Sequence, residues 1–544
     1  MAAPLAVPVF RRIWFASLLS NFGLLIQGVG AAWAMVQMHA SADMVALVQT
    51  ALMLPSMLFA MGAGALADMF DRRKVALVAL SIALASAMGL TITAYADLLS
   101  PPLILVFCFL IGTGSALFSP AWQASVAEQV PPETLPQAVA LSSISYNIAR
   151  SFGPAIGGLV VATAGAAAAF MVNALFYVPM LIVMFAWRRV VRPARLPPEG
   201  TMRAIVSGSR YIMHSPALRV VLLRSMIVAI GGSSLFALMP LVASTLLQGG
   251  AMSYGLLLGS IGIGSVVGAL LVNQVRDRLG IEGSVGLCAL VLGACLAAVA
   301  FSHHLLLSMV ALLIGGAFWT LGITLFNIEI QLSSPRWVAG RSLAAFQTAV
   351  AGGVAIGSWL WGVAVQHSSV STAMLASGAA VAATALLRLG LRVPDAQPRD
   401  LDQAQLGEFE VGLNLSGRSG PVAVEILYTV DPDEARAFYR AMQAVQQIRR
   451  RNGGYDWTIA RDISDPREWV ERFHCPTWHD YLRQRDRMTR EERALIDEAY
   501  AFHQGAEAPA VRRLLERPYG SVRWREEARD EGLHEALPVP ISLS

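Results

Sequence analysis

Long apolar runs, separated by short polar turns, fill the chain as far as residue 391. Each run comes close to the roughly 20 residues that an α-helix needs to cross the hydrocarbon layer of a membrane. The pattern therefore predicts an all-α membrane protein with twelve transmembrane helices. We expect these helices at residues 13–38, 44–66, 75–96, 103–126, 138–163, 167–187, 220–247, 253–275, 283–301, 305–330, 342–365 and 370–391.

Positive charges occur at alternate turns between these helices. Arg11, Arg72, Arg276 and Arg388 mark one set of turns, whereas the other set holds no Lys or Arg. Cytoplasmic loops of membrane proteins carry the excess of Lys and Arg, so the alternation predicts that both termini are cytoplasmic. The expected location of the helices is the cytoplasmic membrane.

Short motifs recur at a nearly constant spacing. The Gly-Ala-Leu that starts at Gly64 recurs at Gly268, 204 residues later, and the Gly-x-Ala-Ile-Gly that starts at Gly153 recurs at Gly353, 200 residues later. Transporters built from such repeats bind substrate between the two repeats, near the middle of the membrane. We predict two pseudo-symmetric six-helix bundles, at residues 1–187 and 220–392. A cytoplasmic linker at residues 188–219 joins them.

The composition changes after residue 392. A polar linker at 393–407 precedes an alternating, β-branched strand at 422–430. Pro432 and neighbouring acids then begin a helix that reaches Arg451. Two strands and a helix follow, at 457–462, 468–474 and 477–500. The order βαββα predicts a soluble, ferredoxin-like α+β domain over 408–517, and residues 518–544 are expected to be disordered.

Composition and charge exclude several classes of function. Hydrophobic residues make up 55% of the chain and charged residues 14%, which is typical of a polytopic membrane protein and not of a soluble enzyme. Residues 1–398 hold 20 Lys and Arg against 11 Asp and Glu. This basic excess lies beside the helices, so it does not indicate nucleic-acid binding. The four cysteines are scattered and predict neither disulfides nor a metal site.

Arg150 is the only charged residue between residues 138 and 187. Its distance from the helix start places it about 18 Å into the membrane, at 1.5 Å per residue. A charge at that depth costs at least about 2.5–3.5 kcal/mol, so it should face a cavity or a partner. We interpret Arg150 as a substrate-binding residue. The alternative is a structural arginine bonded to helix carbonyls and to Asn147.

Other polar and aromatic side chains are expected at the depth of a central cavity. Each could equally serve helix packing or a hydrogen bond between helices. The candidates for substrate binding are Asn21, Gln27, Trp122, Asn147, Trp319 and Gln347.

The turn after the second helix carries the most specific motif. It reads Gly64-Ala-Leu-Ala-Asp68-Met-Phe-Asp71-Arg72-Arg73. It resembles the loop between helices 2 and 3 of the major facilitator superfamily, with Asp71 in place of the second glycine. The variant is similar to the branch of enterobactin exporters and transmembrane secretion effectors, and similar tail domains occur there.

The resemblance implies a secondary active transporter of the bacterial inner membrane, which exports a small amphipathic molecule by alternating access. A siderophore, a drug or a secondary metabolite is the expected substrate, and protons are the expected coupling ion. Cys108, however, occupies a position where proton-coupled members often carry arginine. No cofactor is implied. The implied conformational switch comprises Gly64, Asp68, Arg72 and Arg73, together with Gly153, Pro154 and Gly157 of a partial antiporter signature.

Two rival hypotheses remain open at this point. The tail could be a monooxygenase-like enzyme fused to a transporter, because Trp457, Trp478 and His479 would suit such a site. A docking or dimerisation domain is the favoured interpretation of the tail. The second rival is a membrane scaffold or receptor that transports nothing.

Overall fold

The computed structural model describes residues 3–131, 134–187, 201–335, 337–393, 404, 411–413 and 415–516. The chain forms two compact units. The first contains residues 1–192, 220–331 and 341–395, and the second contains residues 193–219, 332–340 and 396–544. Most of the predicted linker at 393–407 and the predicted disordered segment at 518–544 lie outside the described residues.

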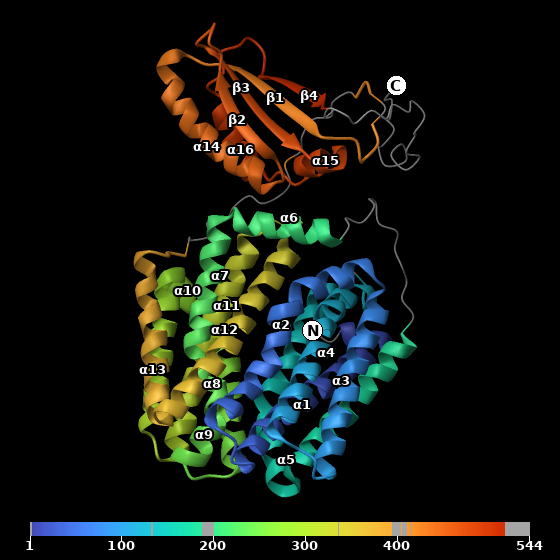
Figure 1. The fold of residues 1–544 in the computed structure, drawn as a ribbon, viewed down its shortest axis with the longest axis vertical. Helices are drawn as coiled ribbons and strands as arrows, with labels where there is room; N and C mark the ends of the chain where they lie inside the picture. Colours follow the sequence, from blue (N-terminus) through green and yellow to red (C-terminus); the bar gives the residue numbers. More distant parts are fainter. Residues whose placement is uncertain are drawn as a thin grey trace. The chain divides into compact units, whose positions relative to one another are not determined.

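Ten helical spans of the described residues are long and apolar enough to cross a membrane. The helices are α1 (Pro8–Gln37), α2 (Ala42–Met69), α3 (Arg72–Tyr95), α4 (Pro101–Gln129), α5 (Leu135–Ala186), α7 (Pro216–Gly232), α8 (Ser234–Ala237), α9 (Met239–Leu241), α10 (Ala251–Phe301), α11 (Leu305–Leu332), α12 (Ala339–His367) and α13 (Val370–Ala383). Figure 1 shows the N-terminal helices in blue beside the C-terminal helices in green and yellow.

Two of these spans, α5 and α10, each cross the membrane twice. They contain Gly165 and Gly280, whose φ angles of 82° and 65° are open mainly to glycine. Gly153 of α5 lies against Leu25 of α1, whereas Ala169, beyond Gly165, lies against Gly30. The two parts of α5 therefore flank α1. With these two reversals the ten spans make twelve crossings, which confirms the predicted helical membrane fold.

Two predicted helices are interrupted. The helix expected at 220–247 is divided into α7, α8, α9 and a π-helical turn, η3 (Val242–Leu246). Gly231, Gly232 and Pro240 fall at these breaks because glycine and proline are poor residues for a helix interior. The last helix, expected to reach residue 391, ends as a 3₁₀ turn, η4 (Thr384–Leu389).

The tail forms a four-stranded antiparallel sheet with the strand order β2-β3-β1-β4. This order confirms the ferredoxin-like class (Figure 1). Its helix α16 starts at the Thr489 capping box, so the single helix expected at 477–500 is two. The elements of the second unit are α6 (Thr201–Met213), β1 (Val422–Thr429), η5 (Pro432–Glu434), α14 (Ala435–Arg451), β2 (Tyr455–Arg461), β3 (Glu468–Cys475), α15 (Trp478–Asp486), α16 (Arg490–Tyr500) and β4 (Ala510–Leu515).

A buried carboxylate lies in the core of this domain. Glu471 is fully buried and accepts hydrogen bonds at 3.0 Å from Arg449 Nε, the Tyr428 hydroxyl and Trp457 Nε1. Burial alone would lower the pKa of Arg449, but the Glu471 carboxylate outweighs it and raises that pKa. Burial, reinforced by the same carboxylate, raises the pKa of Tyr428. The network keeps the Arg449 guanidinium charged inside an apolar core.

Candidate transport site

The two six-helix halves make their tightest contact where α5 crosses α10. A Cβ atom added to Gly158 would lie 2.7 Å from the Cα of Gly255. Two turns along, the Ser151 hydroxyl donates a hydrogen bond of 3.1 Å to the carbonyl of Gly262. The missing side chains let the two backbones approach closely, as small residues do at helix crossings in membranes.

A second contact between the halves joins α2 to α12. The Thr50 hydroxyl donates to the Ala355 carbonyl at 2.8 Å. A Cβ atom on Gly362 would lie 2.6 Å from that of Ala46. Nearby, the rings of Trp33 and Tyr254 stack at 6.3 Å. These contacts, like the α5–α10 crossing, lie toward the end of the bundle whose turns carry no Lys or Arg.

Arg150 lies on α5 beside this crossing and faces the interior. Successive residues of an α-helix are about 100° apart. Ala155 and Gly158 contact α10 and Gly157 contacts α1, so Arg150 points between these two neighbours. Phe152, on the opposite face, is 53% exposed. Arg150 is partly exposed, and it makes no hydrogen bond or ion pair with another described residue.

The repeat between the two halves gives Asn147 and Arg150 equivalent positions in α12. The repeat offset of 200 residues matches Asn147 with Gln347 and Arg150 with Val350 of α12. Gln347 is exposed and Val350 partly exposed. The two halves therefore present unlike surfaces at equivalent positions, one with a guanidinium and one with an apolar side chain.

Comparisons with known proteins identify the family. The sequence model of the transmembrane secretion effectors matches residues 1–519. The chain belongs to this family. It is 22% identical to the staphyloferrin A transporter of Staphylococcus aureus over 61% of this chain and 84% of that protein. It is 24% identical to the multidrug efflux pump Tap of Mycobacterium tuberculosis, over 72% of this chain and 94% of that protein. It is 27% identical to the enterobactin exporter EntS of Shigella flexneri, over 65% of this chain and 84% of that protein.

Solved structures support the same fold. The nucleoside transporter NupG superposes with a TM-score of 0.55 at 11% identity, over 70% of this chain and 98% of that one. A bacterial homologue of the lysosomal transporter Spinster, in an inward-facing conformation, superposes with a TM-score of 0.53 at 13% identity, over 71% and 95%. The secretion effector is thus a multi-pass membrane transporter of the major facilitator superfamily, surrounded by lipid and acting on small molecules.

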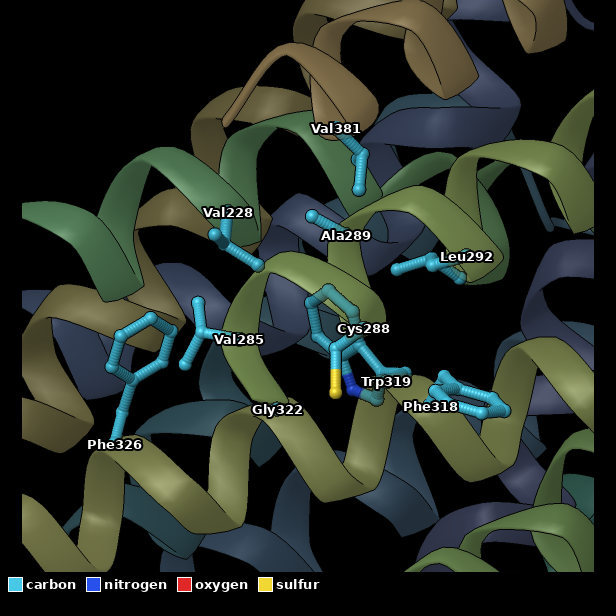
Figure 2. Close-up of a pocket in the computed structure, with 10 residues that line it drawn as sticks. All are labelled: Val228, Val285, Cys288, Ala289, Leu292, Phe318, Trp319, Gly322, Phe326 and Val381. Atoms are coloured by element: carbon cyan, nitrogen blue, oxygen red, sulfur yellow. The ribbon is translucent and has the colours of Figure 1, made fainter. Parts of the chain in front are cut away.

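Two of the predicted binding residues lie inside the bundles of this secretion effector. Gln27 is fully buried, and its side-chain oxygen accepts from Asn173 Nδ2 at 3.0 Å while its amide contacts Cys108 Sγ at 3.6 Å. These bonds tie α1, α4 and α5 together. Trp319 lines a small apolar cavity within the second half, between α7, α10, α11 and α13 (Figure 2). The sequence analysis did not select Asn173 as a candidate, although it is the only asparagine between residues 167 and 187.

The remaining candidates are distributed over separate helices. Trp122 stacks on Phe118 of α4 with ring centres 6.1 Å apart, and Asn21 of α1 is partly exposed. Asn147 shares the face of Arg150, since the two are three residues apart on α5. The structure therefore groups Arg150 and Asn147 on one helix and leaves the other candidates elsewhere.

The switch loop is organised by its charges. The Asp71 carboxylate caps α3 by accepting from the backbone amides of Arg73 and Lys74, which explains why aspartate suits this position. Arg72 pairs with Glu128 of α4 at 2.8 Å. Arg73 donates to the carbonyls of Met184 and Phe185, the end of α5. The side chain of Asp68 lies outside the described residues.

The three glycines of the predicted switch differ in their surroundings. Gly64 has open space where a Cβ would lie, so its role is not close packing. Gly153 and Gly157 pack against α1 within their own half, whereas the neighbouring Gly158 meets the other half. Gly158 is therefore the glycine of this motif that contacts the other half.

The second half has an anchor of its own that sequence analysis overlooked. Arg224 of α7 is 1% exposed, pairs with Glu282 and donates to the Leu391 carbonyl at 3.1 Å. Glu282 also accepts from the Val393 amide. Arg224 is the only charged residue between residues 220 and 275, so the reasoning that singled out Arg150 would have found it.

Substitution of Gly158 by alanine is expected to weaken the crossing. The new Cβ would meet backbone atoms of α10 that cannot rotate away, and such overpacking costs about 1–3 kcal/mol. The midpoint of thermal unfolding of the detergent-purified protein should fall. Gly286→Ala in α10 is the matched control, because open space surrounds that position. Equal midpoints for the two variants would contradict the assignment.

Proposed function

We propose that this secretion effector exports a small, amphipathic, oxygen-rich anion across the bacterial inner membrane by alternating access. The observation that carries the proposal is the position of Arg150, a partly exposed cation on the interior face of α5 beside the crossing of the two halves. Two relatives are named for siderophores, staphyloferrin A and enterobactin, which are oxygen-rich molecules of this kind.

The chemistry of the two equivalent positions supports this class of substrate. A guanidinium presents five N–H donors in a planar fork, which suits carboxylate and catecholate oxygens. Charge-assisted hydrogen bonds to it are roughly twice as strong as neutral ones. Val350, at the equivalent position of α12, offers an apolar surface for the other end of the molecule. We propose protons as the coupling ion.

Transport by purified protein in vesicles tests the proposal. Enterobactin and staphyloferrin A serve as anionic probes, and ethidium serves as a cationic one. With an imposed pH gradient, the vesicles should accumulate the siderophores, and a protonophore should abolish the accumulation. Movement of ethidium alone would contradict the anionic assignment. Movement of no probe, when the protein is folded, would favour the scaffold hypothesis.

The proposed orientation places both termini in the cytoplasm. Cysteines introduced at Ser100 and Gly249 should react with an impermeant maleimide added to intact cells. A cysteine at Ile463, a fully exposed residue of the tail, should react only after the membrane is opened. The four native cysteines are buried and give a low background. The reverse labelling pattern would overturn the orientation.

We propose that Asp68 acts in the switch, pairing when the cytoplasmic end closes. Family resemblance points to nearby cations and to the start of α12 near Arg341 as its partners, where the helix dipole favours an anion. Asp68→Asn should slow siderophore transport while leaving siderophore affinity unchanged. A variant with the wild-type transport rate would reduce Asp68 to a topological anchor.

A further inference from the structure

The break between α7 and α8 leaves backbone carbonyls that need new partners. It lies inside the apolar span of residues 216–246, where α7 ends at Gly232 and α8 begins at Ser234. In a continuous helix the carbonyls of Ile230 and Gly231 would accept hydrogen bonds from the backbone amides four residues further on. Inside a membrane no water replaces such bonds, so the protein itself must satisfy these carbonyls.

Side chains of two other helices satisfy them. Trp361 Nε1 of α12 donates to the Ile230 carbonyl at 2.8 Å, and the Ser377 hydroxyl of α13 donates to the Gly231 carbonyl at 2.6 Å. Trp361 is 8% exposed and Ser377 is fully buried. The break is therefore fastened to α12 and α13 of its own half.

Packing holds the break on its other sides. A Cβ atom on Gly231 would lie 2.8 Å from Val381 of α13, and one on Gly232 would lie 2.5 Å from the ring of Trp319 of α11. Trp319 and Val381 also line the small apolar cavity of this half (Figure 2). The break thus has fixed supports, and the cavity beside it leaves room for the packing to adjust.

Beyond the break the chain reaches the other half. We call residues 234–246, which comprise α8, α9 and η3, the external segment, because they lie at the external end in the proposed orientation. In this segment α8 contacts α2, α9 contacts α1 and α2, and η3 contacts α10 and α13. Leu235 and Met239 are fully buried in these contacts. The external segment therefore closes part of the seam between the two halves.

One side-chain hydrogen bond ties the start of the external segment to α13. The hydroxyls of Ser234 and Ser377 are 2.5 Å apart, and both side chains are fully buried. A serine hydroxyl has a single proton, and that of Ser377 goes to the Gly231 carbonyl. Ser234 is therefore the donor, and Ser377 joins the fixed break to the external segment.

We propose that the external segment is a gate that hinges at Gly231 and Gly232 and is held closed by the Ser234–Ser377 hydrogen bond. The proposal rests on the proposed function, because alternating access requires the external end to open for release of the substrate. Such opening can occur by rocking of whole bundles or by gating of one part. In a rigid half the external segment moves with α7, whereas a hinge lets it leave α1 and α2 while α7 stays. Glycine has the backbone freedom that a hinge needs.

Distances within the second half test the hinge without any substrate. Spin labels at Thr245 of η3 and Ser368, just after α12, are placed on exposed residues of the same half. Ser234→Ala removes the hydrogen bond that holds the segment closed, and the loss of one such bond should raise the open population about two- to tenfold. Pulsed EPR of the detergent-purified full chain should then show a larger second population of distances than in the wild type.

A serine on the other side of the break is the matched control. Ser225 of α7 is also fully buried, but its hydroxyl donates at 2.9 Å to the Leu222 carbonyl of its own helix. Ser225→Ala should therefore leave the distances as in the wild type. An unchanged distribution in Ser234→Ala would overturn the hinge, since a rigid half keeps the two labels at one distance.

A disulfide within the second half tests whether the hinge serves transport. Sulfurs in place of the Ser234 and Ser377 hydroxyls would lie within reach of a bond, so oxidation of Ser234→Cys/Ser377→Cys should fasten the external segment to α13. Siderophore transport in vesicles should be lost on oxidation and restored by a reductant. The control is Gly322→Cys, whose Cβ would lie 3.4 Å from that of the native Cys288. That disulfide joins α11 to α10 away from the external segment, and transport should survive it.

The outcomes separate this proposal from the proposed function. Wild-type transport by the oxidised Ser234→Cys/Ser377→Cys variant would show that the second half moves as a rigid body, and it would overturn the gate. Failure of the wild type to transport any probe would refute the proposed function alone, since the spin-label distances still decide whether the segment hinges.

Discussion

Arg150→Met is expected to abolish siderophore transport while the helices still fold and insert. Methionine retains an unbranched, flexible side chain, although a shorter one, and it removes the charge and all five donors. Each hydrogen bond to a charged group contributes about 1.5–3 kcal/mol, so siderophore affinity should fall about tenfold to a hundredfold or more. Affinity measured on the purified, folded variant checks this directly.

Two further variants separate substrate binding from structure. Arg150→Lys retains the charge and loses the planar fork, so it should retain part of the affinity. Val350→Met, at the equivalent position of the other half, should leave the affinity for anions nearly unchanged. If Arg150→Met binds siderophores normally and only its unfolding midpoint falls, then Arg150 is a structural arginine and the site assignment is wrong.

Glu471→Gln is expected to unfold the tail domain. The substitution leaves the Arg449 guanidinium buried without a counter-charge, and breaking a buried pair in this way costs about 3–5 kcal/mol. That loss is a large part of the stability of a small domain, which totals about 5–15 kcal/mol. Protease resistance of the tail, measured on the full chain, should fall to a small fraction of the wild-type value.

The same strand offers a matched control. Glu468→Gln removes a charge from an exposed position of β3, and it should leave protease resistance unchanged. Adding Arg449→Met to Glu471→Gln removes both charges, and it should restore part of the stability because no unpaired charge then remains. Wild-type resistance in Glu471→Gln alone would show that the network contributes little.

The sequence by itself determined the architecture of this protein. The length and spacing of apolar runs predicted twelve crossings, because the thickness of the membrane sets the length of a spanning helix. The alternation of apolar and polar residues at 422–430 predicted β1, since successive side chains of a strand point to opposite faces. The strand β4 was missed because Arg512 and Arg513 interrupt any apolar alternation there.

Only the tertiary structure decided which side chains meet. Gln27 looked like a cavity residue, but it binds Asn173, a partner 146 residues away that no local pattern relates to it. Arg224 and Glu282 are likewise 58 residues apart. Gly158 allows the close contact between the two halves because its face of α5 meets Gly255 of α10. The period of a helix shows that it has faces, but the packing of the whole chain decides what each face contacts.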